Sequence, residues 1–334
     1  MISARKTAVA LFLLCGVARA QDALDRLSEI APGRSAEYIA LRESFDASDL
    51  PRLKEAATPG QWTRENWTRA LAAEACRLRI EEPELAAELD RPRGLDPNVY
   101  RNFRRPVPLC LRQFRHVGVR GIPLLLERWR WTFSEHPFSG GDAGREERKV
   151  LRQAIIAAAG QTGDVRAMFF LEEILANENE APLWRSEAAV SLGMCAGEKA
   201  LPTLLEFIDG KSPLDVRRAC ARALGRVPTL GALDAIRFRL GADPDLDLDL
   251  VTALGLLGSE WGWKSRGAGS GKKIRKGCAD ALVQQITRIP GHSASIGRAL
   301  ALVAWPESLA RVEALKELPA AREILLPLRR ALDR

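Results

Sequence analysis

The chain has 334 residues, of which 46% are hydrophobic and 28% charged, and its formal net charge is +7. This length corresponds nominally to two domains, and the small basic excess does not indicate nucleic acid as a partner. After the N-terminus, no apolar segment approaches the length of a membrane-spanning helix.

Residues 1–20 follow the order of a secretory signal peptide. Arg5 and Lys6 precede an apolar run over Ala8–Val17, and the small-x-small triplet Ala18–Ala20 stands before Gln21. The run is too short to cross a bilayer, and the alternative interpretation is an ordinary buried first helix. Cleavage between Ala20 and Gln21 removes three basic residues and would leave a periplasmic or secreted chain with a net charge of +4.

A nine-residue helical segment that ends in glycine, here called a glycine line, occurs four times in the middle of the chain. The glycines lie 33, 32 and 30 residues apart, and the copies are Arg152–Gly160, Arg185–Gly193, Arg217–Gly225 and Asp247–Gly255. A period of this size predicts stacked helical hairpins, each with an alanine-rich first helix and a leucine-rich second helix. We expect Gly225 to adopt the left-handed conformation that ends a helix.

The array is expected to extend beyond these copies in degenerate form. Residues 21–148 are predicted to hold degenerate helical repeats, among them an alanine-rich helix over Trp67–Leu78 and a Pro/Arg-rich insertion. Residues 149–334 are predicted to hold the clear array, which ends in a weak hairpin after Ile296 and a capping helix over Ile324–Leu332.

The third copy carries a resemblance to a known family. The segment Asp215–Arg217, followed by Ala221 and by Ala223–Gly225, resembles the HEAT-repeat family, and in particular the short HEAT-like repeats related to phycobilin lyases. The resemblance implies an all-α fold, an α-solenoid of stacked antiparallel helical hairpins. It says little about function, because such repeats serve many unrelated roles.

Residues 262–277 interrupt the fourth repeat and are expected to form a basic, glycine-rich loop. This loop could bind a phosphate, a polyanion or an acidic partner, and the alternative is a solvated loop without a ligand. It is not a P-loop, because Arg266 stands where that motif needs glycine. Six cations form this predicted anion or partner site: Lys264, Arg266, Lys272, Lys273, Arg275 and Lys276.

Four aspartates alternate just before the fourth glycine line, at positions 243, 245, 247 and 249. Alternating aspartates are typical of calcium loops, but an EF-hand needs glycine at its sixth position and glutamate at its twelfth, where this chain has Leu248 and Leu254. We therefore expect these carboxylates to start a helix, whose positive end favours them.

Catalytic groups are scarce. The three histidines, His116, His136 and His292, are isolated, and none is followed by glutamate. The iron-binding His-Glu pairs of the HEAT-repeat hydroxylases are therefore missing, and no cluster has metal-ligand spacing. The sequence predicts no catalytic residue, no metal ligand and no cofactor. Five cysteines remain after signal cleavage and are expected to be buried free thiols; the alternative is one disulfide bridge in an oxidising compartment, whose pair the sequence does not identify.

Taken together, these patterns predict an exported HEAT-like scaffold that binds other proteins and has no catalytic activity of its own. An acidic polymer is a second expected partner, and no nucleic acid is expected. Two alternatives remain open: a HEAT-like lyase or enzyme-auxiliary protein, and a polyanion-binding module that uses residues 262–277.

Overall fold

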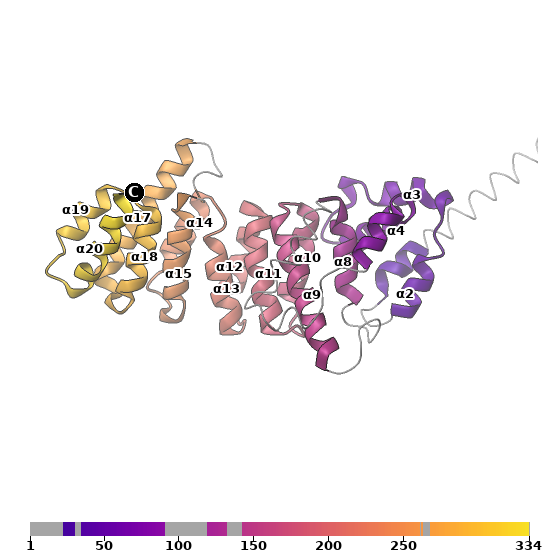
Figure 1. Cartoon of the computed structure of the whole chain (residues 1–334), viewed down its shortest axis with the longest axis horizontal. Helices are drawn as coiled ribbons and strands as arrows, with labels where there is room; N and C mark the ends of the chain where they lie inside the picture. The colour runs from indigo at the N-terminus through magenta and orange to yellow at the C-terminus, as the bar shows by residue number, and fades with distance from the viewer. Residues whose placement is uncertain are drawn as a thin grey trace, which may run out of the picture. The chain divides into compact units, whose positions relative to one another are not determined.

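The computed structural model describes residues 23–30, 35–90, 119–131, 142–260, 262 and 268–333, and these form helices joined by turns, with no strand among them (Figure 1). No helix in these ranges is both long and apolar enough to cross a bilayer. The predicted signal peptide at residues 1–20 lies outside the described residues, so its cleavage stays a prediction.

The chain divides into two compact units, Met1–Ala158 and Ala159–Arg334. In the first unit, the predicted alanine-rich helix is present and packs on several neighbours, with Leu53, Ala73 and Cys76 in the core between them. A first helix covers residues 23–29. The later helices that lie in this unit or begin in it are α2 (Ser35–Arg42), η1 (Ala47–Asp49), α3 (Leu50–Ala56), η2 (Pro59–Gln61), α4 (Trp67–Glu81), α5 (Pro83–Asp90), η3 (Val119–Gly121), α8 (Ile122–Trp131) and α9 (Asp142–Gln161).

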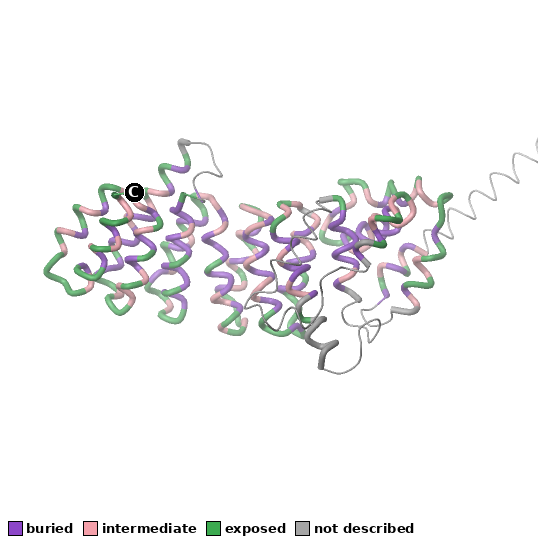
Figure 2. Tube along the Cα trace, in the orientation of Figure 1, coloured by how far each residue is buried: buried purple, intermediate pink, exposed green. Residues whose placement is uncertain are grey.

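The second unit is a stack of helical hairpins in chain order (Figure 1). Buried residues recur along each helix, and exposed residues gather at the turns (Figure 2). The predicted all-α, HEAT-like solenoid is therefore confirmed. Its helices are α10 (Val165–Ala176), α11 (Pro182–Cys195), η4 (Gly197–Ala200), α12 (Leu201–Asp209), α13 (Leu214–Leu224), α14 (Leu230–Arg239), α15 (Pro244–Leu257), α17 (Ala268–Arg288), η5 (Pro290–His292), α18 (Ser293–Val303), α19 (Glu307–Glu313) and α20 (Pro319–Leu332).

The repeated glycines lie where one first helix touches the next. A Cβ atom on Gly193 would be 2.6 Å from the carbonyl oxygen of Ala223, and one on Gly225 would be 2.7 Å from the carbonyl oxygen of Ala253. The backbone of the neighbouring helix therefore leaves no room for a side chain. Gly225 has a right-handed φ of −63°, so the expected left-handed helix end is wrong; the glycine is needed for close approach.

Two of the arginines that open the glycine lines, Arg185 and Arg217, bind the end of the preceding second helix. Arg185 Nε donates to the carbonyl of Leu175 at 2.8 Å, and Arg217 Nε donates to the carbonyl of Ile208 at 2.9 Å. These carbonyls lie in the last turns of α10 and α12, where no intrahelical donor remains. In the fourth line Asp247 takes the same position and accepts from the N–H of Gly241 at 2.7 Å. The side chain at this position is thus positive where it meets a backbone carbonyl and negative where it meets a backbone N–H.

The aspartate run starts α15, as expected. Asp243 is the N-cap, accepting from the N–H of Asp245, and its second oxygen lies 2.5 Å from Arg217. Asp249 lies 2.8 Å from Arg222. These carboxylates are thus engaged by backbone and arginine donors, an arrangement that supports the helix-start interpretation over the calcium loop.

The cysteines that the structure describes are free and buried, as predicted: Cys76, Cys195, Cys220 and Cys278. Burial raises the pKa of the Cys195 and Cys220 thiols to about 12, so both stay protonated near neutral pH. They act as small packing residues.

Candidate binding groove between α14 and α17

Helices α14 and α17 are the second helices of successive hairpins and contact one another. Near the middle of the two helices, a Cβ on Gly277 would be only 2.5 Å from a methyl carbon of Leu233. The residues that line one cavity follow Leu233 on α14 and Gly277 on α17, so the two helices run in the same direction. Further toward their C-terminal ends they border a groove.

This groove holds a cavity of about 360 Å³. Its volume is within the range of sites that take a ligand side chain or a small molecule. The polar and aromatic residues that line it are Asp234, Arg237, Phe238, Gln284, Gln285 and Arg288.

Phe238 is the most exposed large apolar side chain among those described, with 82% of its surface accessible. The guanidinium of Arg239 lies 5.8 Å from the centre of its ring, and Arg239 is itself held by an ion pair with Asp209. Phenylalanine is among the residues enriched in protein–protein interfaces relative to the rest of the surface.

Gln285 lines the same cavity but is 4% exposed. Its amide oxygen, Oε1, is buried and has no hydrogen-bond donor in the described part of the chain. Such an unpaired acceptor costs about 1–3 kcal/mol, and nearly all buried polar groups in proteins are paired. The wall of the groove therefore contains a residue whose amide oxygen is left without a donor.

The rim of the groove is cationic. Arg237 and Arg288 are exposed, and Asp234 supplies one carboxylate, whose oxygen lies 3.9 Å from Arg237. At that distance and exposure the pair contributes little. Two guanidiniums against one carboxylate leave a net positive charge beside the buried amide.

The predicted basic site lies elsewhere. Lys264 and Arg266 fall outside the described residues. From Ala268 onward the chain forms α17 in place of the predicted loop, because Ile274, Cys278 and Leu282 recur every four residues and are buried.

The remaining four cations lie on the first half of α17. Lys272, Lys273 and Lys276 are exposed, and anion binding by these lysines stays a prediction. Arg275 is engaged within the protein: it donates to the carbonyls of Val303 and Ala304 at the end of α18. None of the four lines the groove.

Sequence reasoning missed the groove residues. Phe238 follows an arginine on a short helix, and Gln285 interrupts the apolar stripe of α17, next to Ala281 and Leu282. A polar residue within a buried stripe was the available signal. Its significance depends on an aromatic residue 47 positions earlier, which only the fold brings close.

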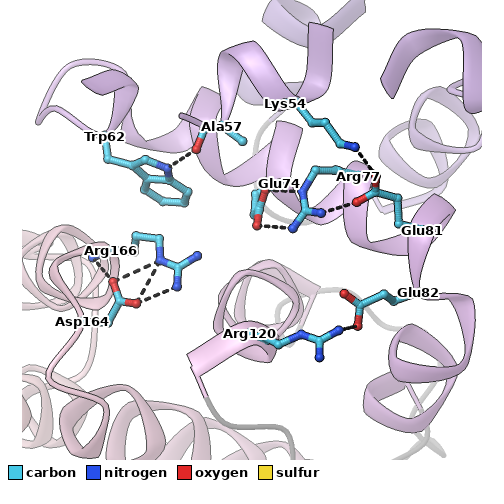
Figure 3. A network of polar contacts seen from close by, with 10 residues as sticks. All are labelled: Lys54, Ala57, Trp62, Glu74, Arg77, Glu81, Glu82, Arg120, Asp164 and Arg166. Atoms are coloured by element: carbon cyan, nitrogen blue, oxygen red, sulfur yellow. Dashed lines mark hydrogen bonds and ion pairs between the residues drawn. The ribbon is translucent and has the colours of Figure 1, made fainter. Parts of the chain in front are cut away.

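The first unit carries dense polar networks that are closed on themselves. Arg77 bonds both oxygens of Glu74 at 2.7 Å and also contacts Glu81, which pairs with Lys54 at 2.5 Å (Figure 3). Trp62 Nε1 donates to the carbonyl of Ala57 at 2.9 Å. Since these donors and acceptors satisfy each other, we assign these networks to stability.

No three His, Cys, Asp or Glu side chains within the described ranges are placed to hold a metal ion. The one histidine in those ranges, His292, ends the short helix η5.

No protein-family model matches the chain. Three curated relatives match in part, and all are deoxyhypusine hydroxylases: from Candida albicans (30% identical over 82 residues, 25% of this chain and 26% of that protein), Debaryomyces hansenii (24% over 83 residues, 25% and 27%) and Eremothecium gossypii (33% over 107 residues, 30% and 33%). The chain thus spans about a quarter to a third of the length of these relatives.

Among solved structures, human deoxyhypusine hydroxylase in complex with glycerol aligns with 76% of this chain and 96% of its own, at 15% identity and a TM-score of 0.32.

These matches correct the expected function. The sequence predicted a scaffold without catalytic activity, whereas the matched relatives are named as enzymes, so that prediction is wrong. The predicted export of the chain stays a prediction. The finer resemblance to the phycobilin-lyase type also finds no support among them. The chain is a HEAT-like helical-repeat protein that is similar, over part of its length, to deoxyhypusine hydroxylases.

Proposed function

We propose that this chain is an enzyme that acts on a protein substrate, and that the groove between α14 and α17 binds a segment of that substrate. The partial similarity to deoxyhypusine hydroxylases supports an enzymatic role. The main observation in support of the binding site is that one cavity is lined by both Gln285, whose amide oxygen is buried and unpaired, and Phe238, whose ring is exposed.

The proposal does not extend to the iron chemistry of the HEAT-repeat hydroxylases. Their metal is held by His-Glu pairs, and none of the three histidines of this chain is followed by glutamate. The described residues offer no other cluster of suitable ligands. The residues of this chain therefore do not fit that iron centre, and the proposed role of the groove is substrate recognition.

A protein segment suits the groove better than a small molecule. The cavity is bordered by two parallel helices and has an exposed aromatic at its edge, and aromatic residues commonly anchor protein partners. Main-chain N–H groups, which every segment carries, supply the donor that Gln285 lacks.

A phage-displayed library of short random peptides, selected on the full chain, tests the proposal. We expect enriched peptides to bind the wild-type chain and to bind Phe238→Ala about tenfold more weakly. Leu326→Ala is the matched control, since Leu326 is also apolar and 57% exposed in the same unit but belongs to α20. Failure to enrich any peptide, or equal binding to Phe238→Ala, would overturn the proposal.

A further inference from the structure

We infer that the groove selects an acidic segment, in which a carboxylate lies next to an apolar side chain and a main-chain N–H bonds to Gln285. This inference rests on the proposed function and specifies the chemistry of its substrate. Three features of the groove support it: an acceptor without a donor, two arginines and a single carboxylate among the lining residues, and an open aromatic ring.

The buried amide determines the polarity of the contact in the cavity. Oε1 of Gln285 only accepts hydrogen bonds, so its partner must present an N–H or O–H group. In an extended segment, one main-chain N–H enters the cavity while the neighbouring side chains point to either side. The amide thus fixes the register of the segment.

The two arginines determine the charge of the segment. Arg237 lies in the last turn of α14 and Arg288 in the last turn of α17, and because the helices run parallel, both guanidiniums belong to the same end of the groove. Arg288 has no ion-pair partner among the described residues, and Asp234 lies 3.9 Å from Arg237. Guanidinium groups bind carboxylates through paired hydrogen bonds, so a glutamate or aspartate complements this end.

Phe238 determines which kind of side chain lies next to that carboxylate in the bound segment. It stands next to Arg237 on α14, and Arg239, held by Asp209, lies near its ring. The part of the ring that stays exposed is suited to an apolar side chain. The recognised pattern is therefore an acidic residue close to an apolar one.

Three matched sets of peptides test whether the groove prefers a negatively charged segment. Each has a central leucine, flanked by glutamates in the first set, by the isosteric glutamines in the second and by lysines in the third. We expect the glutamate peptides to bind the full chain about tenfold more tightly than the glutamine peptides, as measured by fluorescence anisotropy at low salt. Equal affinity of the two sets would overturn the inference.

Reversing the charge of Arg237 and Arg288 tests whether these two arginines cause the preference. The double variant Arg237→Glu/Arg288→Glu should lose the preference for glutamate peptides and favour lysine peptides, whereas Arg330→Glu, an exposed arginine on α20, should leave the preference unchanged. If Phe238→Ala weakens all peptides alike and charge makes no difference, the proposed function stands and the acidic inference fails. If no peptide of any charge binds, the proposed function fails as well.

The hydrogen bond to Gln285 is tested by a double-mutant cycle. N-methylation of one peptide bond removes one N–H, and a scan along a bound peptide should find a position where affinity for the wild-type chain falls about tenfold. At that position the methyl group should have no further effect on Gln285→Leu. Additive losses, or a scan without any sensitive position, would overturn the assigned contact.

Discussion

Arg79 of α4 donates to Glu127 of α8 at 2.7 Å, and that carboxylate is only 1% exposed. Tyr38 donates to the other oxygen at 3.0 Å, and Arg42 lies 3.5 Å from it. One buried carboxylate therefore joins three segments of the first unit. Its removal would leave buried donors without an acceptor, a far larger loss than that of an exposed pair.

We accordingly expect Glu127→Leu to destabilise the first unit by about 3–5 kcal/mol, measured by urea denaturation. The double variant Glu127→Leu/Arg79→Leu should recover part of this loss. Glu82→Gln is the control, because Glu82 pairs with Arg120, whose side chain is 72% exposed, and such pairs contribute about 0–1 kcal/mol. Equal losses for Glu127→Leu and Glu82→Gln would contradict the prediction.

Gln285→Leu should raise the melting temperature of the chain, because it removes a buried acceptor that has no donor. The expected gain is on the order of 1 kcal/mol, the lower end of the cost of leaving such a group unpaired. Gln284→Leu, at the exposed neighbouring position, should change stability by less than about 0.5 kcal/mol. A loss of stability in Gln285→Leu would mean that the amide is paired within the fold.

Gly193→Ala should destabilise the second unit by about 1–3 kcal/mol, since the added methyl group would meet the backbone of Ala223, which cannot rotate away as a side chain can. Gly291→Ala, in the same unit, is the control, because no atom lies within 4 Å of its Cβ position. Thermal melts of the two variants compare them directly, and equal melting temperatures would refute the proposed contact.

The buried thiols predict a reactivity pattern. Burial raises the pKa of Cys195 and Cys220 to about 12, so at about pH 8 neither forms the thiolate that reacts with iodoacetamide. Mass spectrometry of the digested protein should find both unlabelled in the native chain and labelled in urea. Labelling of either cysteine in the native chain would contradict the assigned burial.

The same pKa shifts predict loss of stability at alkaline pH. The thiol pKa is raised in the folded state, so the stabilising effect is fully present below the ordinary thiol value and is lost as the pH rises from there toward about 12. The double variant Cys195→Ala/Cys220→Ala should show a smaller fall in melting temperature over this range than the wild-type chain, and an unchanged fall would rule the thiols out as its source.

The sequence was sufficient to predict the helical hairpins, because Val216, Ala219 and Ala223 repeat at helical spacing and the glycines repeat at a fixed period. It was misleading at Gly225, since a glycine is compatible both with a left-handed helix end and with a close helix contact, and only the neighbouring backbone decides between them. It was misleading again at residues 268–277, where glycine and lysine content concealed the buried positions of a helix.

The candidate site could not be predicted in the same way. Gln285 and Phe238 belong to different repeats, and the importance of each depends on the other. Neither matches a motif, because what distinguishes them is the environment: a polar group without a donor and an apolar group without cover. Periodicity describes what the repeats share, and these two residues are departures from it.

The glycine contacts give the first helices of the hairpins and the second helices different tolerance to mutation. Between first helices, spacing is set by one backbone against another, so substitutions there would shift whole repeats relative to each other. Between α14 and α17 the contact at Gly277 is with the flexible end of the Leu233 side chain, which can adjust. The contact between these second helices can therefore accept new side chains while the register of the stack is preserved.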